Sequence, residues 1–312
     1  MMSTQPAVFS HEPVMVREIT ELFANVPDGV VLDATLGGAG HTTAILDAHP
    51  GLRVLGLDRD PAALEASRVR LAPYGDRAML QHRRFDDLDA AMSEAGITEL
   101  SGALFDLGVS SHQFDSGERG FSYRHDAPLD MRMDTTESTT AADVVNQASE
   151  GEIAHLLREY SDEKFAGRIA RAIIAARPIH TTAELADVVA SAIPAPARRR
   201  GGHPAKRTFQ ALRISLNKEL EILPNAIDSA VRRTRIGGRV AVLSYHSGED
   251  RIIKARFKQH ATGGCECPST LPCGCGATRI VRLVRVASKP NAEEQLSNPR
   301  SSSARLRVAE VL

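Results

Sequence analysis

The feature that most constrains the fold is the stretch of residues 30–58, where two apolar runs flank a glycine-rich turn. The first run ends in Asp33, the turn contains Gly37, Gly38 and Gly40, and the second run ends in Asp58. Because glycine lacks a Cβ and tolerates positive φ, such a turn lets the backbone approach a ligand closely. The order of strand, tight turn, helical segment and second strand predicts the first half of a nucleotide-binding βαβ unit.

The acids at the strand ends bear on which cofactor this unit binds. Asp58 follows Gly40 by 18 residues (58 − 40), a spacing that suits hydrogen bonds to a ribose diol. The turn alone also fits NAD, so an NAD-dependent oxidoreductase is one alternative. Against it, Asp33 stands before the turn, where dinucleotide enzymes usually keep an apolar residue, and the G-x-G-x-x-G spacing is missing. The D-x-x-x-G-x-x-G arrangement resembles the first motif of class I S-adenosylmethionine methyltransferases.

Length and charge set further bounds. The chain has 312 residues, 42% of them hydrophobic and 25% charged, which suits one large or two modest globular domains. Its net charge of −1 excludes a global attraction to nucleic acid, so any such surface must be a local patch. The start of the chain lacks a basic-then-apolar signal pattern, and no apolar run reaches the ~18 residues of a membrane span. We therefore expect a cytoplasmic protein with no membrane partner.

The α/β alternation continues after Asp58 and places more polar groups at strand ends. We expect a third strand at 78–81 followed by Phe85, a helix at 86–95, and a fourth strand at 103–106 that ends in Asp106. In a doubly wound sheet the fourth strand lies beside the first, so Asp106 should face the same ligand as the glycine-rich turn. Phe85 is placed to cover an adenine ring, although a core position is an equal alternative.

Between residues 116 and 217 the alternation gives way to helical patterns, one of which opens with a capping box at Thr181 and Glu184. We predict a helical domain (116–217) inserted between two parts of an α/β domain (1–115 and 218–312). The second part should contain a helix over 212–227 ended by Gly237 and Gly238, a strand at 240–243, a helix at 252–260, and an edge hairpin of 280–286 and 306–311. The end of the insert carries five cations and no acid within ten residues, which suits contacts with RNA phosphates, the alternative being a solvated loop: Arg198, Arg199, Arg200, Lys206 and Arg207.

The chain has four cysteines, all within one segment of 11 residues: Cys265, Cys267, Cys273 and Cys275. This clustering argues against a secreted fold held by disulfides. Four thiolates can hold a structural zinc ion tetrahedrally. The spacing is not the usual C-x2-C knuckle, so a zinc site and unliganded thiols both remain open.

Several longer motifs share one resemblance. They are D-A-T-L-G-G-A-G-H-T (33–42), D-L-G-V-S-S (106–111), P-L-D-M-R-M-D (128–134), R-T-F-Q-A-L-R-I (207–214) and S-Y-H-S-G-E-D-R (244–251). Through them the chain resembles the bacterial 16S ribosomal RNA (cytosine-N4)-methyltransferases, the MraW/RsmH family. The resemblance implies an α/β fold, a class I SAM-dependent methyltransferase (Rossmann-like) sheet with an inserted helical domain. It also implies S-adenosylmethionine as cofactor. The implied acceptor is a cytidine in the decoding region of 16S rRNA in the small ribosomal subunit, and its methylation would tune the decoding site. A homodimer is left open.

Matching positions within these motifs imply a set of cofactor contacts: Ala39, Gly40, His41, Asp58, Phe85, Asp106 and Gln113. Two positions depart from the family pattern. Ala39 stands where glycine is common, which fits the turn if φ at this residue stays negative. Gly248 stands where a bulkier residue is frequent, which would loosen the 244–251 loop.

The chemistry that the resemblance implies needs a hydrogen-bond acceptor beside a poorly nucleophilic exocyclic amine, with the reacting atoms held in line. Amino-methyltransferases often use an Asp/Asn-Pro-Pro-aromatic motif after the fourth strand, and here Asp106 occupies that place without the prolines. Asp106 is therefore the candidate catalytic residue, or else a cofactor ligand. Weaker candidates are Ser110, Ser111, Tyr245 and His246. A second alternative, a non-catalytic RNA-binding protein, is disfavoured by the intact strand-end acids.

Overall fold

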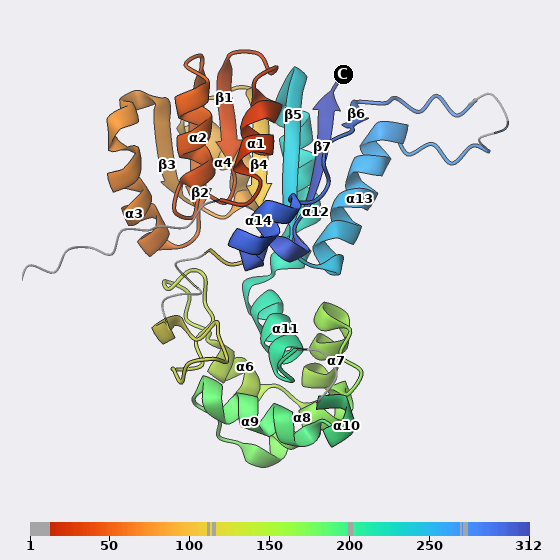
Figure 1. Cartoon of the computed structure of the whole chain (residues 1–312). Helices are drawn as coiled ribbons and strands as arrows, with labels where there is room; N and C mark the ends of the chain where they lie inside the picture. Colours follow the sequence, from red (N-terminus) through yellow and green to blue (C-terminus); the bar gives the residue numbers. More distant parts are fainter. Residues whose placement is uncertain (1–12, 111–112, 114–116, 199–201, 269, 271–273) are drawn as a thin grey trace, which may run out of the picture. The chain divides into compact units, whose positions relative to one another are not determined.

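The computed structural model describes residues 13–110, 113, 117–198, 202–268, 270 and 274–312 (Figure 1). The chain forms two compact units, one made of Met1–Ser111 with Leu223–Leu312 and the other of His112–Ile222. The predicted insert, 116–217, falls inside the range of the second unit. None of the helices in the described part of the chain combines the length and the apolar character needed to cross a bilayer.

The first unit is built on a seven-stranded sheet of order β3-β2-β1-β4-β5-β7-β6. Strands β1 to β5 are parallel, and β7 is antiparallel to both of its neighbours. The order confirms the α/β fold of the class I methyltransferase type, the fourth strand beside the first, and the antiparallel edge hairpin. The strands are β1 Gly29–Asp33, β2 Leu52–Asp58, β3 Ala78–His82, β4 Leu100–Asp106, β5 Thr234–Ser244, β6 Val281–Val284 and β7 Arg305–Val311.

Both faces of this sheet are buried, which explains why its strands read as continuous apolar runs. Successive side chains of a strand point to opposite faces. Leu32 and Leu55 accordingly join one apolar cluster, and Val31 and Val54 join the other. The helical segments of this unit are α1 Val16–Phe23, α2 Gly40–Ala48, α3 Pro61–Leu71, η1 Ala72–Arg77, η2 Phe85–Asp87, α4 Leu88–Glu94, α12 Glu219–Arg233 (which begins within the range of the second unit), α13 Ser247–Thr262, α14 Ala292–Ser297 and η4 Pro299–Ser303.

The prediction of one helix ended by Gly237 and Gly238 is wrong. The segment forms two helices, α11 (Lys206–Asn217) and α12 (Glu219–Arg233), separated at Lys218, whose φ is 53°. Both glycines lie inside β5, where Gly237 has a φ of 80°. A Cβ on Gly238 would lie 2.6 Å from the carbonyl oxygen of Ser101 in the neighbouring strand, so glycine is needed for close backbone approach.

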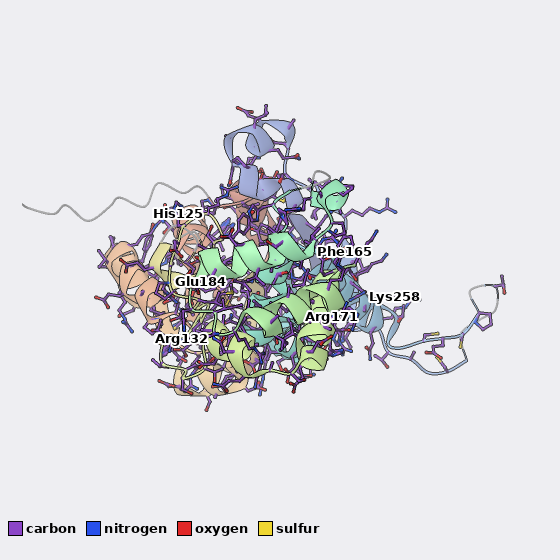
Figure 2. The ribbon with its side chains drawn as sticks, turned by 90° about the horizontal axis from the view of Figure 1, so that it is seen from below. His125, Arg132, Phe165, Arg171, Glu184 and Lys258 are labelled. Carbon is purple, nitrogen blue, oxygen red and sulfur yellow. The ribbon has the colours of Figure 1, made fainter. Side chains whose placement is uncertain are left out.

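The second unit is helical, as predicted. The capping box at Thr181 and Glu184 is confirmed at the start of α9. Figure 2 shows the side chains, with Arg132 among those labelled. The Arg132 guanidinium donates a 2.7 Å hydrogen bond to the Asp130 carboxylate, which lies two residues earlier in the 128–134 motif. The segments are η3 Gly117–Arg119, α6 Ala141–Gln147, α7 Glu150–Ser161, α8 Ala166–Ala176, α9 Thr182–Ala192, α10 Ala195–Arg198 and α11 Lys206–Asn217.

Candidate active site

Three acids end three neighbouring strands of the first unit. Asp33 ends β1, Asp58 ends β2 and Asp106 ends β4. Parallel pairing of β2, β1 and β4 brings these ends to one edge of the sheet. Ligands of open α/β sheets bind outside the carboxyl ends of the strands, so this edge is the candidate site.

The turn after β1 is bonded directly to Asp58. The Gly37 amide donates to one carboxylate oxygen of Asp58 at 2.7 Å, and the Asp60 amide donates to the other at 2.8 Å. Burial raises the pKa of Asp58 from 3.8 to about 6. Since each carboxylate oxygen has two lone-pair directions, both can accept a further hydrogen bond from a ligand hydroxyl.

The turn itself departs from expectation at Ala39. The φ of this residue is 58°, so the expectation that it stays negative is wrong. The Ala39 amide donates to the Leu36 carbonyl at 2.7 Å, and Ala39 adopts the left-handed conformation directly before α2, which begins at Gly40. For a residue with a Cβ, the left-handed conformation costs roughly 1–2 kcal/mol. A Cβ on Gly40 would lie 2.3 Å from Pro13, whereas the space around Gly38 is open.

Asp33 holds this loop in place through two hydrogen bonds. Its carboxylate accepts a 2.6 Å hydrogen bond from the Thr42 hydroxyl and a 3.2 Å bond from the Thr35 amide. Burial raises the pKa of Asp33. The Thr35 hydroxyl in turn accepts from the Asp106 amide at 2.6 Å. Sequence reasoning missed both threonines, although each is a hydroxyl residue close behind a strand-end acid.

Asp106 lies between two aromatic side chains from distant parts of the unit. One of its carboxylate oxygens accepts a 2.6 Å hydrogen bond from the Tyr245 hydroxyl. The other lies 3.5 Å from Nδ1 of His41, and 26% of the Asp106 side chain is exposed. His41 Nε2 donates to the Val14 carbonyl at 2.9 Å, because a carbonyl oxygen can only accept. Asp106 is thus held in place while part of it remains accessible.

Tyr245 acts on this site as a neutral donor. Burial, together with the adjacent Asp106 carboxylate, raises the pKa of Tyr245 well above its usual range. The phenol therefore keeps its proton at neutral pH and stays hydrogen-bonded to Asp106. A phenolate at Tyr245 is therefore not expected at neutral pH, and the phenol donates to the Asp106 carboxylate.

His246 takes part in the cap at the start of α13. Its Nδ1 accepts from the Gly248 amide at 3.2 Å at the start of α13. The buried Glu249 carboxylate accepts from the Tyr245 amide at 2.8 Å and from the His246 amide at 3.2 Å. This capping box orients the loop that carries Tyr245, and sequence reasoning missed Glu249 in that role.

The other residues predicted to line the site differ in their packing and burial. Phe85 packs edge-on against the buried Phe105, with ring centroids 5.8 Å apart, so it is partly a core residue. Gln113 is buried, and Ser110 is half-buried. Ser111 lies outside the described residues.

The predicted RNA-binding cations lie in the second unit. Arg198, Lys206 and Arg207 are exposed, whereas Arg199 and Arg200 lie outside the described residues. Beside Lys206, the exposed ring of His203 stacks on Tyr123 with centroids 4.2 Å apart. This aromatic pair, which sequence reasoning missed, adds a stacking surface to the exposed charges.

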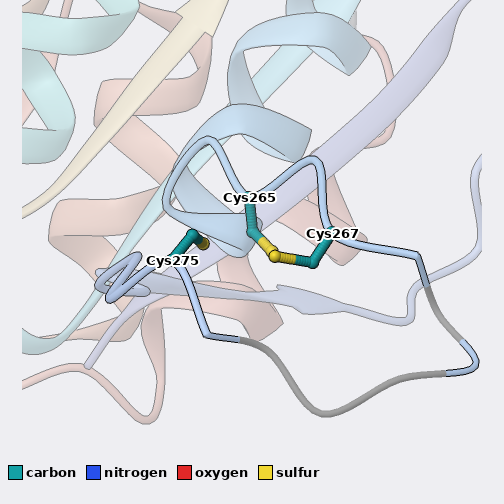
Figure 3. Close-up of side chains that lie close together, drawn as sticks. All are labelled: Cys265, Cys267 and Cys275. Atoms are coloured by element: carbon teal, nitrogen blue, oxygen red, sulfur yellow. The ribbon is translucent and has the colours of Figure 1, made fainter.

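The cysteine cluster is partly described. The thiols of Cys265, Cys267 and Cys275 all lie within 4.8 Å of one another (Figure 3). Cys273 lies outside the described residues.

A family model and several curated relatives match nearly the whole chain. The model of the MraW methylase family matches residues 8–312. The ribosomal RNA small subunit methyltransferase H of Thermobifida fusca is 50% identical over 307 residues, covering 96% of this chain and 93% of the relative. The protein of the same name from Heliobacterium modesticaldum is 49% identical over 312 residues, covering 97% and 99%. A solved rRNA methylase from Streptococcus thermophilus gives a TM-score of 0.41 at 12% identity, covering 95% of this chain and 93% of that one.

Proposed function

The chain belongs to the MraW methylase family, and from this premise we propose that it transfers a methyl group from S-adenosylmethionine to N4 of a cytidine. The acceptor cytidine lies in the decoding region of 16S rRNA in the small ribosomal subunit, and its methylation tunes decoding. One observation carries the proposal: the partly exposed Asp106, held by the Tyr245 hydroxyl, lies on the same sheet edge as Asp58 and the glycine-rich turn. In this proposal Asp106, which accepts the amine proton, and Asp58, which binds the ribose, therefore lie on the same edge of the sheet. A reaction on ribosomal RNA places the enzyme in the cytoplasm.

The residues at this edge fit an adenosine cofactor. The Asp58 carboxylate can accept hydrogen bonds from ribose hydroxyls in addition to its two amide donors. The open space at Gly38 leaves room for a ligand beside the backbone. Ala39, Gly40, His41 and Phe85 line the same region in the proposal. S-adenosylmethionine supplies, when bound, a methyl group on a sulfonium sulfur, which is a good leaving group.

Asp106 acts on the acceptor amine. Its carboxylate accepts hydrogen bonds from the exocyclic N–H groups, which returns electron density to the nitrogen, and then holds the proton that the nitrogen loses. Tyr245 fixes one carboxylate oxygen by donating to it at 2.6 Å. His41 Nδ1, 3.5 Å from the other oxygen, can receive the proton from Asp106. Thr35 fixes the Asp106 backbone, so the geometry is set before the acceptor arrives.

RNA contacts come from the second unit in this proposal. The target base must leave its stack, which costs least in looped RNA. Arg198, Lys206 and Arg207 offer cations to phosphates, and the exposed His203 ring on Tyr123 offers an aromatic surface for a base.

Removal of the exposed charges in the Arg198→Gln, Lys206→Gln double variant is expected to weaken RNA binding about tenfold. Each lost phosphate contact should also reduce the slope of log K against log salt by roughly 0.7–1. Filter binding of 16S rRNA fragments across a salt series measures both quantities. Arg17→Ala, which removes an exposed cation of α1, is the matched control and should change neither. Loss of S-adenosylmethionine binding in the double variant would contradict this assignment.

Cofactor affinity is expected to fall as the pH drops below about 6. The pKa of Asp58 is about 6, and only its ionised form accepts from two ribose hydroxyls at full strength. Protonation therefore opposes binding, by up to about tenfold in Kd for each pH unit below the pKa. Calorimetric titration of S-adenosylmethionine between about pH 8 and pH 5 measures this dependence. Asp58→Asn should remove it, and an unchanged pH profile in that variant would contradict the assignment.

The reaction is tested by transfer of labelled methyl groups to small subunits that lack the modification. Label recovered as N4-methylcytidine supports the proposed function. No label on subunits or on naked 16S rRNA favours the non-catalytic RNA-binding alternative. A melting temperature raised by NAD and not by S-adenosylmethionine would favour the oxidoreductase.

A further inference from the structure

The segment between α13 and β6 leaves the first unit and returns to the same point. Its two ends are joined by a 3.1 Å hydrogen bond from the Ile280 amide to the His260 carbonyl. A Cβ on Gly263 would lie 2.4 Å from the Thr278 carbonyl oxygen, so the two arms touch at the base. Beyond the base the segment extends away from α13 and β6 (Figure 1). We refer to residues 263–280 as the extension.

The described part of the extension beyond its base has few apolar side chains with which to stabilise itself. Among its described residues beyond the base, the side chains are exposed or half-buried, and Pro268 and Ala277 are the apolar ones apart from cysteine. A segment this short cannot bury enough apolar surface to offset the entropy of ordering it. Small structures of this kind are usually held by disulfides or by a metal ion.

Three thiols lie close together between the two arms of the extension. Cys265 and Cys267 lie on one arm and Cys275 on the other, with all three sulfur atoms within 4.8 Å of one another (Figure 3). Zinc–thiolate bonds of about 2.3 Å in a tetrahedron place sulfur atoms about 3.8 Å apart. Small side-chain movements therefore suffice to form the site. The Cys265 amide donates to the Thr262 carbonyl at 3.1 Å, which ties the first thiol to the end of α13.

We propose that Cys265, Cys267 and Cys275 bind one zinc ion that links the two arms of the extension. The set of described ligands is purely thiol, and soft thiolates select zinc over magnesium or calcium. Binding draws the thiols into their thiolate form and makes the metal part of the folded structure. The remaining thiol of the sequence, Cys273, lies outside the described residues.

The zinc ion is structural and separate from the site of methyl transfer. β7 is antiparallel to β5, and β6 is antiparallel to β7, so β6 runs parallel to β5. The extension precedes Val281, the first residue of β6, and therefore adjoins the amino edge of the sheet. Asp33, Asp58 and Asp106 lie at the carboxyl edge. Loss of zinc should leave S-adenosylmethionine binding intact.

Metal content and cobalt spectroscopy of the full-length protein, purified under reducing conditions, test this proposal. We expect about one zinc per chain, and cobalt substitution should produce thiolate-to-metal charge-transfer and tetrahedral ligand-field bands. Cys265→Ser and Cys275→Ser should each lower zinc affinity at least tenfold. Glu266→Gln, which changes an exposed side chain between two ligands, is the matched control and should keep the metal. Unchanged S-adenosylmethionine binding shows that each variant is folded.

A second measurement tests whether the zinc ion stabilises the extension. Limited proteolysis within residues 263–280 should be slow with zinc bound and faster after chelation or in either serine variant. Four outcomes would overturn the proposal: no zinc in the reduced wild-type protein, an iron–sulfur chromophore instead, a disulfide between these cysteines that persists in reductant, or full zinc retention in both serine variants.

Discussion

Asp106→Asn is expected to lower the rate of methyl transfer about a thousandfold while changing the Kd for S-adenosylmethionine only a few-fold. Loss of a positioned general base typically costs 10²–10⁴-fold. The asparagine amide keeps the shape of the side chain but cannot take a proton. Its NH2 group would also face either the Tyr245 hydroxyl or His41, both of which the carboxylate now contacts. Single-turnover transfer to small subunits, with Kd measured separately, distinguishes chemistry from binding.

A matched pair of variants separates this effect from general damage. Tyr74 and Asp47 form another Tyr–Asp hydrogen bond in the same unit, 2.5 Å long and exposed. Asp47→Asn should leave the rate unchanged. Tyr245→Phe should lower the rate by roughly ten- to a hundredfold, because Asp106 loses one charge-assisted hydrogen bond. If Asp106→Asn abolishes cofactor binding and spares single-turnover chemistry at saturation, Asp106 is a cofactor ligand and not the base.

Asp58→Asn is expected to raise the Kd for S-adenosylmethionine by about 10–100-fold and, without cofactor, to stabilise the protein at neutral pH. The binding loss follows from weakened hydrogen bonds between a charged group and ribose hydroxyls, worth about 1.5–3 kcal/mol. The gain in stability follows from the pKa of about 6, which lies above the ordinary value of 3.8. The unfolded protein ionises this group more readily, so its burial destabilises the fold. This cost is fully present above about pH 6 and is lost as the pH falls towards 3.8.

The gain in stability is limited because two backbone amides donate hydrogen bonds to the Asp58 carboxylate. The shift in pKa corresponds to roughly 3 kcal/mol, but an asparagine offers one oxygen where Gly37 and Asp60 need two acceptors. A net gain of about 1 kcal/mol, or ~2 °C in Tm, remains. Thermal unfolding at about pH 8 should show it, and at about pH 5 it should be absent. A variant that is less stable at both pH values would show that hydrogen bonding outweighs burial.

Local sequence patterns predicted the sheet well. Apolar runs that end in Asp33, Asp58 and Asp106 mark buried parallel strands, and the order of connections then places their ends together. The same local reasoning failed at Gly237 and Gly238. Glycines after a helical pattern usually mark its end, but here Gly237 adopts a positive φ inside β5, and Gly238 lets β5 approach β4 closely. That need arises from a neighbouring strand, so it is absent from the local pattern.

The sequence by itself determined the strand–turn–helix order, the acids at the strand ends, and the family to which the motifs point. These are properties of residues close together in the chain, where propensity and periodicity act. Only the tertiary structure decided that Asp106 pairs with Tyr245, 139 positions away, and that Ala39 adopts a left-handed conformation. Several hydroxyl and imidazole groups follow the strand ends, and nothing local indicates which of them meets a given carboxylate. That choice depends on the register and packing of whole strands, which form only when the sheet is complete.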